Sequence, residues 1–279
     1  MGRVAPITEH EFNKIRDLLV SVCGIDLKPD QDYLVETRLS ELAVQLGATT
    51  FGELHRHIIA DPEVMPKVVD LMTTNETLWF RDASCWLTLK DKLLPHFFEQ
   101  LKEGKPKIRV WSAASSTGQE AYSLAILIDE ECRRLGHPEW VERFEIRGTD
   151  ISTAAVFLAR QARYDSFTVS RGLSAERCAA YFHKEENSYQ LHQRIIDRAR
   201  FEHFNLMESF APLGRFDLVF CRNVAIYFSK SFKEELFEKI AGVLNSDGFL
   251  LLGATESLFG LKAPFTSQSH LNGVYYVHK

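Results

Sequence analysis

The stretch that decides the fold is residues 108–120, IRVWSAASSTGQE. It opens with a short apolar run typical of a buried β-strand, passes through small residues, and leads into an apolar helical pattern over residues 119–134. A strand that turns directly into a helix is the first half of a β-α-β unit. The segment therefore predicts a sheet with helices packed on it.

The same alternation continues toward the C-terminus. Residues 144–150, 216–220 and 249–252 are predicted to be further strands, and residues 232–244 a helix. Strands separated by helices imply a parallel sheet with right-handed crossovers, which binds ligands at the carboxyl ends of its strands. Residues from about 164 to 200 are polar and break this rhythm, so we expect an inserted subdomain there.

The N-terminal part of the chain has a different pattern. From residue 8 to about 72 the apolar residues recur with a helical period, which predicts a small helical bundle. Thr50 with Glu53 three residues later predicts a capping box for the third helix. Gly24 and Gly47 stand where helices are expected to end.

These patterns divide the chain in two. We expect an all-α N-terminal domain over residues 1–85 and a linker to residue 106, which includes a helix around 86–100. The polar stretch 102–106 marks the boundary. An α/β domain is expected over residues 107–279.

Composition excludes several classes of protein. No apolar run approaches the roughly 18 residues of a membrane span, and the first residues lack a signal-peptide core, so we expect a soluble, cytoplasmic protein without direct membrane insertion. The five cysteines are scattered and never form C-x-x-C, which favours a reducing compartment and no metal site. A net charge of −5 argues against nucleic acid as a partner.

The loop at residues 112–120 contains one glycine. It lacks the G-x-G-x-x-G pattern that brings backbone against a pyrophosphate, which disfavours a nicotinamide dehydrogenase, and it lacks a lysine for a triphosphate. A loop of small residues that opens a helix still admits a ligand without phosphates. The same residues would equally suit a tight turn that packs helix on strand.

Asp150 ends the second predicted strand. Doubly wound folds place an acidic residue there to accept hydrogen bonds from ribose hydroxyls. The alternative is that Asp150 or Ser152 caps the helix expected to begin near residue 153.

Two further segments are rich in polar groups. Residues 220–228, FCRNVAIYF, place Arg222, Asn223 and Tyr227 just beyond a strand, where catalytic groups are expected, although the Tyr227 ring would also suit the core. Residues 73–81, TTNETLWFR, join the two parts of the chain. A capped helix N-terminus is the alternative interpretation there.

Together these segments resemble the CheR-type chemotaxis receptor methyltransferases, which convert receptor glutamates to methyl esters. The resemblance spans nearly the whole chain in order and spacing. It implies a doubly wound, Rossmann-like class I methyltransferase domain with a small inserted β-subdomain, preceded by an all-α domain. The matching strings are TNETLWFR at 74–81, WSAASSTGQEAYS at 111–123, TDI at 149–151 and FCRNVAIYF at 220–228.

The resemblance also implies roles for individual residues. S-adenosylmethionine would be the methyl donor, with no metal, and Arg81 and Tyr227 would lie nearest the reacting methyl group with Asn223 close by. Cys221 and Arg222 would line the cofactor mainly through backbone groups. The other cofactor contacts would be Asn75, Thr77, Arg81 and Glu120 at the methionine part, Asp150 at the ribose, and Asn205 and Leu206 at the adenine.

The partner implied by the resemblance is the cytoplasmic helical domain of chemoreceptors. We expect the enzyme to be a monomer. Residues 1–70 hold seven Lys or Arg against twelve Asp or Glu, so strong long-range steering toward an acidic receptor is not expected. Arg38 and Arg56 are candidates for a local basic patch, with an ordinary solvated surface as the alternative. Residues 182–189 lack the glycine-bearing turn associated with members that grip a receptor tether, which favours a tether-independent enzyme.

The sequence departs from the family pattern at three positions. Trp79 stands where phenylalanine is usual, and Gln119 and Ala121 stand where glutamate and proline are frequent. These changes leave the acceptor more in question than the cofactor. A methyltransferase for another protein or a small molecule, and a non-catalytic signalling module that binds S-adenosylmethionine, are the alternatives.

Overall fold

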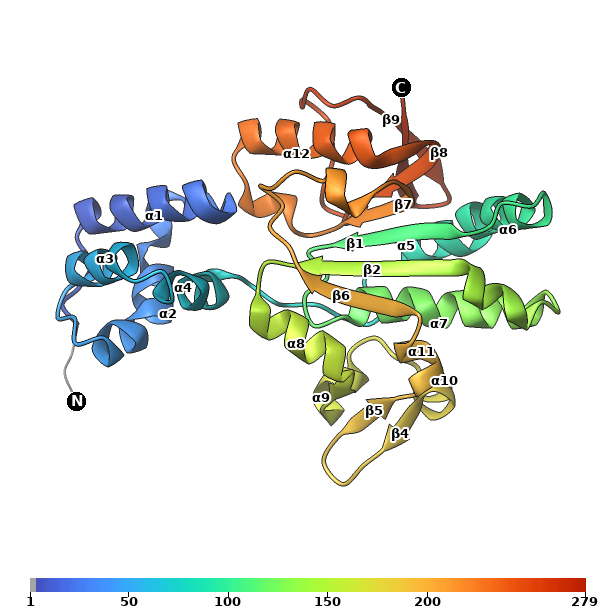
Figure 1. Ribbon diagram of the computed structural model, residues 1–279, viewed down its shortest axis with the longest axis horizontal. Coiled ribbons are helices and arrows are strands. Elements are labelled where there is room, and N and C mark those ends of the chain that lie inside the picture. The colour runs from blue at the N-terminus through green and yellow to red at the C-terminus, as the bar shows by residue number, and fades with distance from the viewer. Residues whose placement is uncertain (1–3) are drawn as a thin grey trace.

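The chain folds into a small cluster of helices and a larger part built on one sheet, as the computed structural model of residues 4–279 shows (Figure 1). The helical cluster, drawn in blue, lies beyond the edge toward which strands β1 and β2 point (Figure 1). No helix among these residues is both long and apolar enough to cross a lipid bilayer.

Four helices and a short 3-10 turn form the cluster. Their buried side chains make a single apolar core, which confirms the predicted all-α N-terminal part. The elements are α1 (Glu9–Cys23), η1 (Pro29–Gln31), α2 (Asp32–Gln45), α3 (Phe51–Ala60) and α4 (Val64–Met72).

The helix ends in the cluster largely follow the sequence signals. Gly24 ends α1 and Gly47 follows α2, both with φ of 75°, a conformation that glycine adopts without strain. At α3 the Thr50 hydroxyl accepts the Glu53 N–H at 3.2 Å, as predicted. The returning half of the capping box is wrong, because the Glu53 carboxylate instead accepts both the N–H and the hydroxyl of Thr49, at 2.8 and 2.9 Å.

The larger part is built on a sheet of seven strands in the order β6-β2-β1-β7-β8-β10-β9. The first five are parallel, and β10 pairs antiparallel with both β8 and β9. Strand order reverses between β1 and β7, which confirms the predicted doubly wound sheet. The strands are β1 (Ile108–Ala113), β2 (Phe144–Asp150), β6 (Ala199–His203), β7 (Phe216–Cys221), β8 (Leu244–Leu251), β9 (Phe265–His270) and β10 (Gly273–His278).

Helices cover both faces of this sheet (Figure 1). On β1, Val110 faces the core under α5, α6, α7 and α8, whereas its neighbour Trp111 faces the core under α12. The predicted helix at 119–134 is α7, and the one at 232–244 is α12. The bounds are α5 (Ala83–Thr88), the π-helical turn η2 (Leu89–Leu93), α6 (Leu94–Lys102), α7 (Gln119–Arg134), η3 (Pro138–Arg143), α8 (Thr153–Gln161), η4 (Ala211–Leu213), η5 (Ala225–Tyr227) and α12 (Lys230–Val243).

A small subdomain is inserted between α8 and β6. It contains an antiparallel sheet in the order β3-β5-β4 together with three short helices. Its elements are β3 (Arg163–Tyr164), α9 (Ser166–Ser170), α10 (Ala175–Tyr181), β4 (Phe182–Lys184), β5 (Tyr189–Leu191) and α11 (Gln193–Ile196).

Trp79 fastens the linker between the two parts to this subdomain. Its ring is 1% exposed and packs edge-on against the rings of Tyr164 and Phe182, at centroid distances of 5.0 and 5.3 Å. The backbone N–H of Trp79 donates to the carbonyl of Arg171 at 3.2 Å. At Gly172, a Cβ would lie 2.0 Å from the Trp79 carbonyl oxygen, so only glycine allows this close approach.

We predict that Trp79→Ala lowers the free energy of unfolding by about 3–5 kcal/mol, the usual cost of removing a buried tryptophan. Trp79→Phe, which keeps an aromatic ring between Tyr164 and Phe182, should lose distinctly less. Urea unfolding followed by circular dichroism measures both variants. Equal stability of wild type and Trp79→Ala would contradict this account of the linker.

Candidate active site

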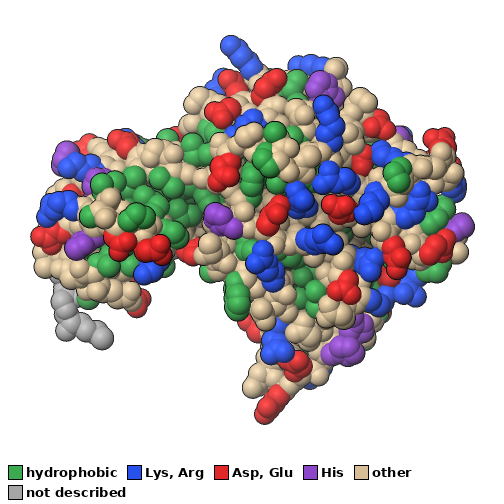
Figure 2. Space-filling model, viewed as in Figure 1, with side chains coloured by type: hydrophobic (Ala, Val, Ile, Leu, Met, Phe, Trp, Pro, Cys, Tyr) green, Lys and Arg blue, Asp and Glu red, His purple; other side chains and the backbone are tan. Residues whose placement is uncertain are grey.

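A cavity of about 280 Å³ lies where the carboxyl ends of the central strands face the helical cluster. Its size is close to the lower end of the roughly 300–1,000 Å³ typical of small-molecule sites. It sits at the reversal of strand order between β1 and β7, where doubly wound sheets bind ligands. Hydrophobic side chains gather where the cluster meets the larger part (Figure 2). Ile151, which lines the cavity, also packs against the core of the cluster.

All but one of the residues implied by the family resemblance line this cavity. The exception is Cys221, whose side chain is fully buried in β7 on the α12 side of the sheet. The residues that the structure brings together are Asn75, Thr77, Arg81, Glu120, Asp150, Asn205, Leu206, Arg222, Asn223 and Tyr227.

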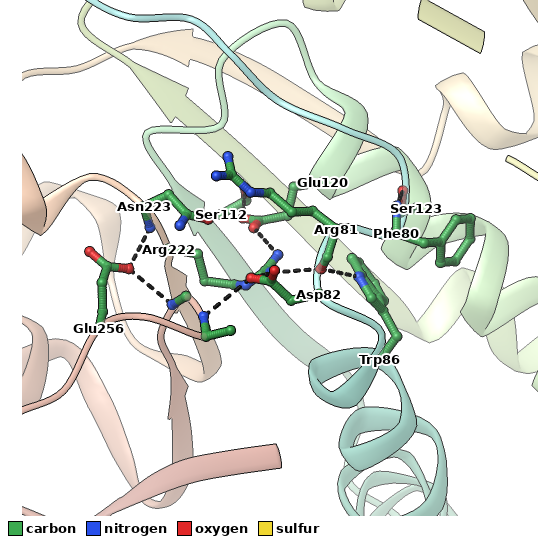
Figure 3. Close-up of polar contacts among 12 residues, drawn as sticks. Phe80, Arg81, Asp82, Trp86, Ser112, Glu120, Ser123, Arg222, Asn223 and Glu256 are labelled. Atoms are coloured by element: carbon green, nitrogen blue, oxygen red, sulfur yellow. Dashed lines mark hydrogen bonds and ion pairs between the residues drawn. The ribbon is translucent and has the colours of Figure 1, made fainter. Parts of the chain in front are cut away.

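The guanidinium of Arg222 is the centre of a buried network (Figure 3). It donates to the Glu120 carboxylate at 2.8 Å, to the Asp82 carboxylate at 2.9 Å and to the Arg81 carbonyl at 2.6 Å. The Trp86 indole donates to the same carbonyl at 2.8 Å. With a side chain only 2% exposed, Arg222 joins the end of β7 to the start of α7 and to the linker.

The charges in this network do not cancel. Burial alone would lower the pKa of the Arg222 guanidinium, but the acidic groups of Cys85, Glu120 and Asp82 raise it by more, so the guanidinium stays charged. Two carboxylates then surround one guanidinium. Of these two carboxylates only that of Glu120 lines the cavity.

Glu120 is held from two sides. It lies in the first turn of α7, where the helix dipole stabilises a carboxylate. One carboxylate oxygen accepts the Ser112 hydroxyl at 2.7 Å and the other accepts Arg222. Each oxygen keeps a further lone pair for a ligand, because a carboxylate oxygen can accept two hydrogen bonds.

The backbone around the cavity is unusually strained. Seven non-glycine residues between positions 4 and 279 have positive φ, and five of them flank the cavity or the Arg222 network. Such conformations cost free energy and cluster at functional sites, where surrounding contacts hold them in place. The five are Phe80, Asp82, Ala114, Ser116 and Asn223, with φ between 47° and 63°.

Asp150 does not cap the helix that follows it. The hydroxyl of Ser152 accepts the Ala155 N–H at 3.1 Å and so caps α8. The Asp150 carboxylate instead accepts the N–H groups of Ser116, at 2.7 Å, and Ser152, at 2.9 Å. Burial raises the pKa of the Asp150 carboxyl above its ordinary value, although these two N–H groups oppose the rise.

Asn205 bridges the two parts of the chain. Its amide nitrogen donates to the Val22 carbonyl at the end of α1 (2.7 Å), and its amide oxygen accepts the Met207 N–H at 3.0 Å. One amide hydrogen is therefore left for a ligand. Leu206 contributes an apolar wall beside it.

Tyr227 and Arg81 reach the cavity from different elements. The Tyr227 carbonyl accepts the Asp26 N–H at 2.9 Å, so the helical cluster holds the backbone of η5. The Arg81 guanidinium donates to the Glu76 carbonyl at 3.2 Å. Among the described residues no hydrogen bond joins the side chains of Arg81 and Tyr227, and both line the cavity.

The site contains residues that the sequence analysis did not select. Arg38, considered above as part of a surface patch, lines the cavity and donates to the Met72 carbonyl at 2.6 Å and the Thr74 hydroxyl at 3.0 Å. Arg56 has a side chain 72% exposed and lies 3.6 Å from the Glu53 carboxylate. Arg38 thus holds the linker, and a basic patch formed by the two arginines stays a prediction.

Two carboxylates at the site were also missed. Asp82 accepts from Arg222 and from the Ala254 N–H, and Glu256 accepts the Asn223 N–H. Their partners are 140, 172 and 33 residues away, so no local spacing could have indicated these contacts. Among residues 4–279 no group of three or more His, Cys, Asp or Glu is arranged to hold a metal ion.

Comparison with known proteins gives consistent matches over the whole chain. Residues 10–73 match the family described as "CheR methyltransferase, all-alpha domain", and residues 75–273 match "CheR methyltransferase, SAM binding domain". The chemotaxis protein methyltransferase Cher2 of Pseudomonas putida is 41% identical, covering 96% of this chain and 98% of that protein. Chemotaxis protein methyltransferases of Vibrio anguillarum (39% identical, 97% of both chains) and Listeria innocua (30%, covering 91% of this chain and 92% of that protein) are similar as well. This chain therefore belongs to the CheR methyltransferase family.

Proposed function

We propose that this methyltransferase transfers the methyl group of S-adenosylmethionine to glutamate side chains in the cytoplasmic helical domain of chemoreceptors, forming methyl esters. It would act as a monomer in the cytoplasm. The observation that carries the proposal is that one cavity gathers residues from every family-like segment of the chain. The chemotaxis methyltransferases that resemble the chain support the choice of acceptor.

The cavity residues fit S-adenosylmethionine, which when bound supplies a methyl group activated by a sulfonium cation. Asp150 offers carboxylate lone pairs suited to ribose hydroxyls, and the Glu120 carboxylate keeps lone pairs suited to the ammonium group of the methionine part. The buried Ser115 hydroxyl has no partner within residues 4–279 although it lines the cavity. A polar atom left in this state is normally satisfied by a ligand or water.

The acceptor needs no general base in this scheme. A glutamate side chain, with a reference pKa of about 4.3, is already a carboxylate at neutral pH. The chain's task is to orient that carboxylate and to exclude water. We assign the orientation to Tyr227 and Arg81, because a phenol and a guanidinium at one cavity offer the hydrogen-bond donors that a carboxylate requires.

Methyl transfer to receptor glutamates can be measured directly. Purified protein with labelled S-adenosylmethionine should label chemoreceptor cytoplasmic fragments, and mild base should release the label as methanol. Receptor fragments with their methylation-site glutamates changed to alanine are the control and should stay unlabelled.

Other outcomes identify the alternatives. Base-stable labelling, or labelling that persists in the alanine fragments, would mean a different acceptor group. Tight binding of S-adenosylhomocysteine without transfer to any receptor fragment would indicate a non-catalytic module.

The two residues assigned to the reacting end, Tyr227 and Arg81, should respond differently to mutation. A hydrogen bond to a charged group contributes about 1.5–3 kcal/mol, so Tyr227→Phe should lower kcat about 10- to 100-fold with little change in affinity for S-adenosylhomocysteine. Arg81→Ala should weaken that affinity as well. Steady-state kinetics and calorimetric titration measure the two effects. Full turnover in Tyr227→Phe and unchanged affinity in Arg81→Ala would refute the assignment.

The proposed ribose contact of Asp150 can be tested with Ser152 as the control. Asp150→Asn should weaken binding of S-adenosylhomocysteine about 10- to 100-fold, because a charge-assisted bond to the ribose is lost. Ser152→Ala, the matched control, should keep that affinity and lower stability by about 1 kcal/mol through loss of the α8 cap. Equal losses of affinity in both variants would count against a ribose contact.

The raised pKa of Asp150 gives the same assignment a pH dependence. The carboxylate is present above that pKa, so affinity for S-adenosylhomocysteine should fall as the pH drops through it. Stability depends on pH in the opposite direction. The native state binds this proton more tightly than the unfolded chain does, so the contribution of Asp150 to the free energy of unfolding falls as the pH rises. Calorimetric titration across pH should show a loss of affinity that is absent in Asp150→Asn.

A further inference from the structure

The loop between β8 and β9 carries a carboxylate that contacts the backbone of the cavity wall. One carboxylate oxygen of Glu256, Oε2, accepts the Asn223 N–H at 2.5 Å and the Gly253 N–H at 2.9 Å (Figure 3). The Glu256 N–H in turn donates to the Gly253 carbonyl at 2.9 Å, which closes a tight turn. The turn is thereby joined to the segment that follows β7.

Asn223 has a backbone conformation that such a contact stabilises. Its φ of 58° is unfavourable for a residue with a side chain, and it stands directly after Arg222. The side chains of Asn223 and Tyr227, four residues apart, both line the cavity. The chain that leaves Asn223 therefore leads directly to Tyr227, whose carbonyl is also held by the Asp26 N–H.

Gly253 lets the two segments approach this closely. A Cβ at that position would lie 2.7 Å from the side-chain nitrogen Nδ2 of Asn223 and 2.8 Å from Oε2 of Glu256. The next residue, Ala254, donates its N–H to Asp82 at 3.2 Å. The turn thus connects to Arg222 through Asp82 and to Asn223 through Glu256.

We propose that Glu256 is a positioning residue for methyl transfer, which acts by holding the Asn223 backbone and through it the side chains of Asn223 and Tyr227. The proposal rests on the proposed function of the cavity, although Glu256 itself does not line it. The role belongs to one oxygen. Both N–H groups bond to Oε2, whereas Oε1 is buried without a partner within residues 4–279.

This asymmetry yields a conservative variant. In Glu256→Gln the amide oxygen can take the place of Oε2 and accept both N–H groups, so turnover should stay within about threefold of wild type. Glu256→Ala removes both bonds and should lower kcat for receptor methylation at least about 10-fold. Affinity for S-adenosylhomocysteine should change less than about threefold, because the Asp150 and Leu206 ends of the cavity are untouched.

A control in the same loop separates positioning from general loosening. The Glu234 carboxylate of α12 accepts the Lys262 N–H at 3.1 Å, so it too holds the β8–β9 loop but does not contact Asn223. Glu234→Ala should leave kcat within about twofold of wild type. Parallel losses of kcat in Glu234→Ala and Glu256→Ala, or an equal loss of kcat and cofactor affinity in Glu256→Ala, would overturn the proposal.

A double-mutant cycle tests the route through Asn223. Glycine adopts positive φ without strain, so the effect of Glu256→Ala on kcat should be smaller when Asn223→Gly is already present. Additive effects would mean that Glu256 does not act through the backbone of Asn223.

Amide hydrogen exchange over residues 222–228 reports the contact without any acceptor. Exchange there should be faster in Glu256→Ala than in wild type, Glu256→Gln or Glu234→Ala. Unchanged exchange would overturn the proposal even if no receptor is methylated. Faster exchange with an inactive wild type would count against the proposed function and leave the structural contact standing.

Discussion

The buried guanidinium of Arg222 is the interaction on which the rest of the site depends. It bonds to Glu120 at the start of α7, and to Asp82 and the Arg81 carbonyl in the linker. Together with the end of β7, which carries Arg222, three distant segments thus meet at one charge. A buried charge is costly to desolvate, and removing one partner of a buried ion pair typically costs about 3–5 kcal/mol. These three segments can therefore rearrange only together.

Carboxylates hold the strained backbone of the cavity in a recurring way. Ser116 and Asn223 both have positive φ directly beyond adjacent strands, and each donates its N–H to a carboxylate, Asp150 in the first case and Glu256 in the second. Parallel strands that end side by side must turn away sharply to leave room for a ligand. The carboxylate that accepts each N–H stabilises the turn, Glu256 from outside the cavity and Asp150 from its wall. The cavity is consequently shaped by backbone and by side chains outside its lining as much as by the residues that face it.

The division between what the sequence predicted and what it did not has a physical reason. Helix α7 and strand β7 were predicted within one residue, because hydrophobic period and small-residue turns are local signals. The start of α12 was placed two residues late, because its Ser229 cap was overlooked. Local spacing says nothing about which carboxylate meets which N–H across the fold, so Asp82 and Glu256 were missed. Asp150, Arg222, Asn223 and Tyr227 were indicated by their positions at strand ends, whereas Asn205 and Leu206 were reached only through resemblance to a family.

The helical cluster is part of the cavity, not an attachment to it. The loop between α1 and α2 supplies one wall, and the Asp26 N–H holds the Tyr227 carbonyl while Val22 accepts from Asn205. Under the proposed reaction no base has to be supplied, so the barrier must be lowered by orientation and by exclusion of water. A cavity open on the side of residues 23–31 would do neither well. The helices of the cluster therefore complete the chamber in which the acceptor would react, and they contact its reacting end through the backbone of Tyr227.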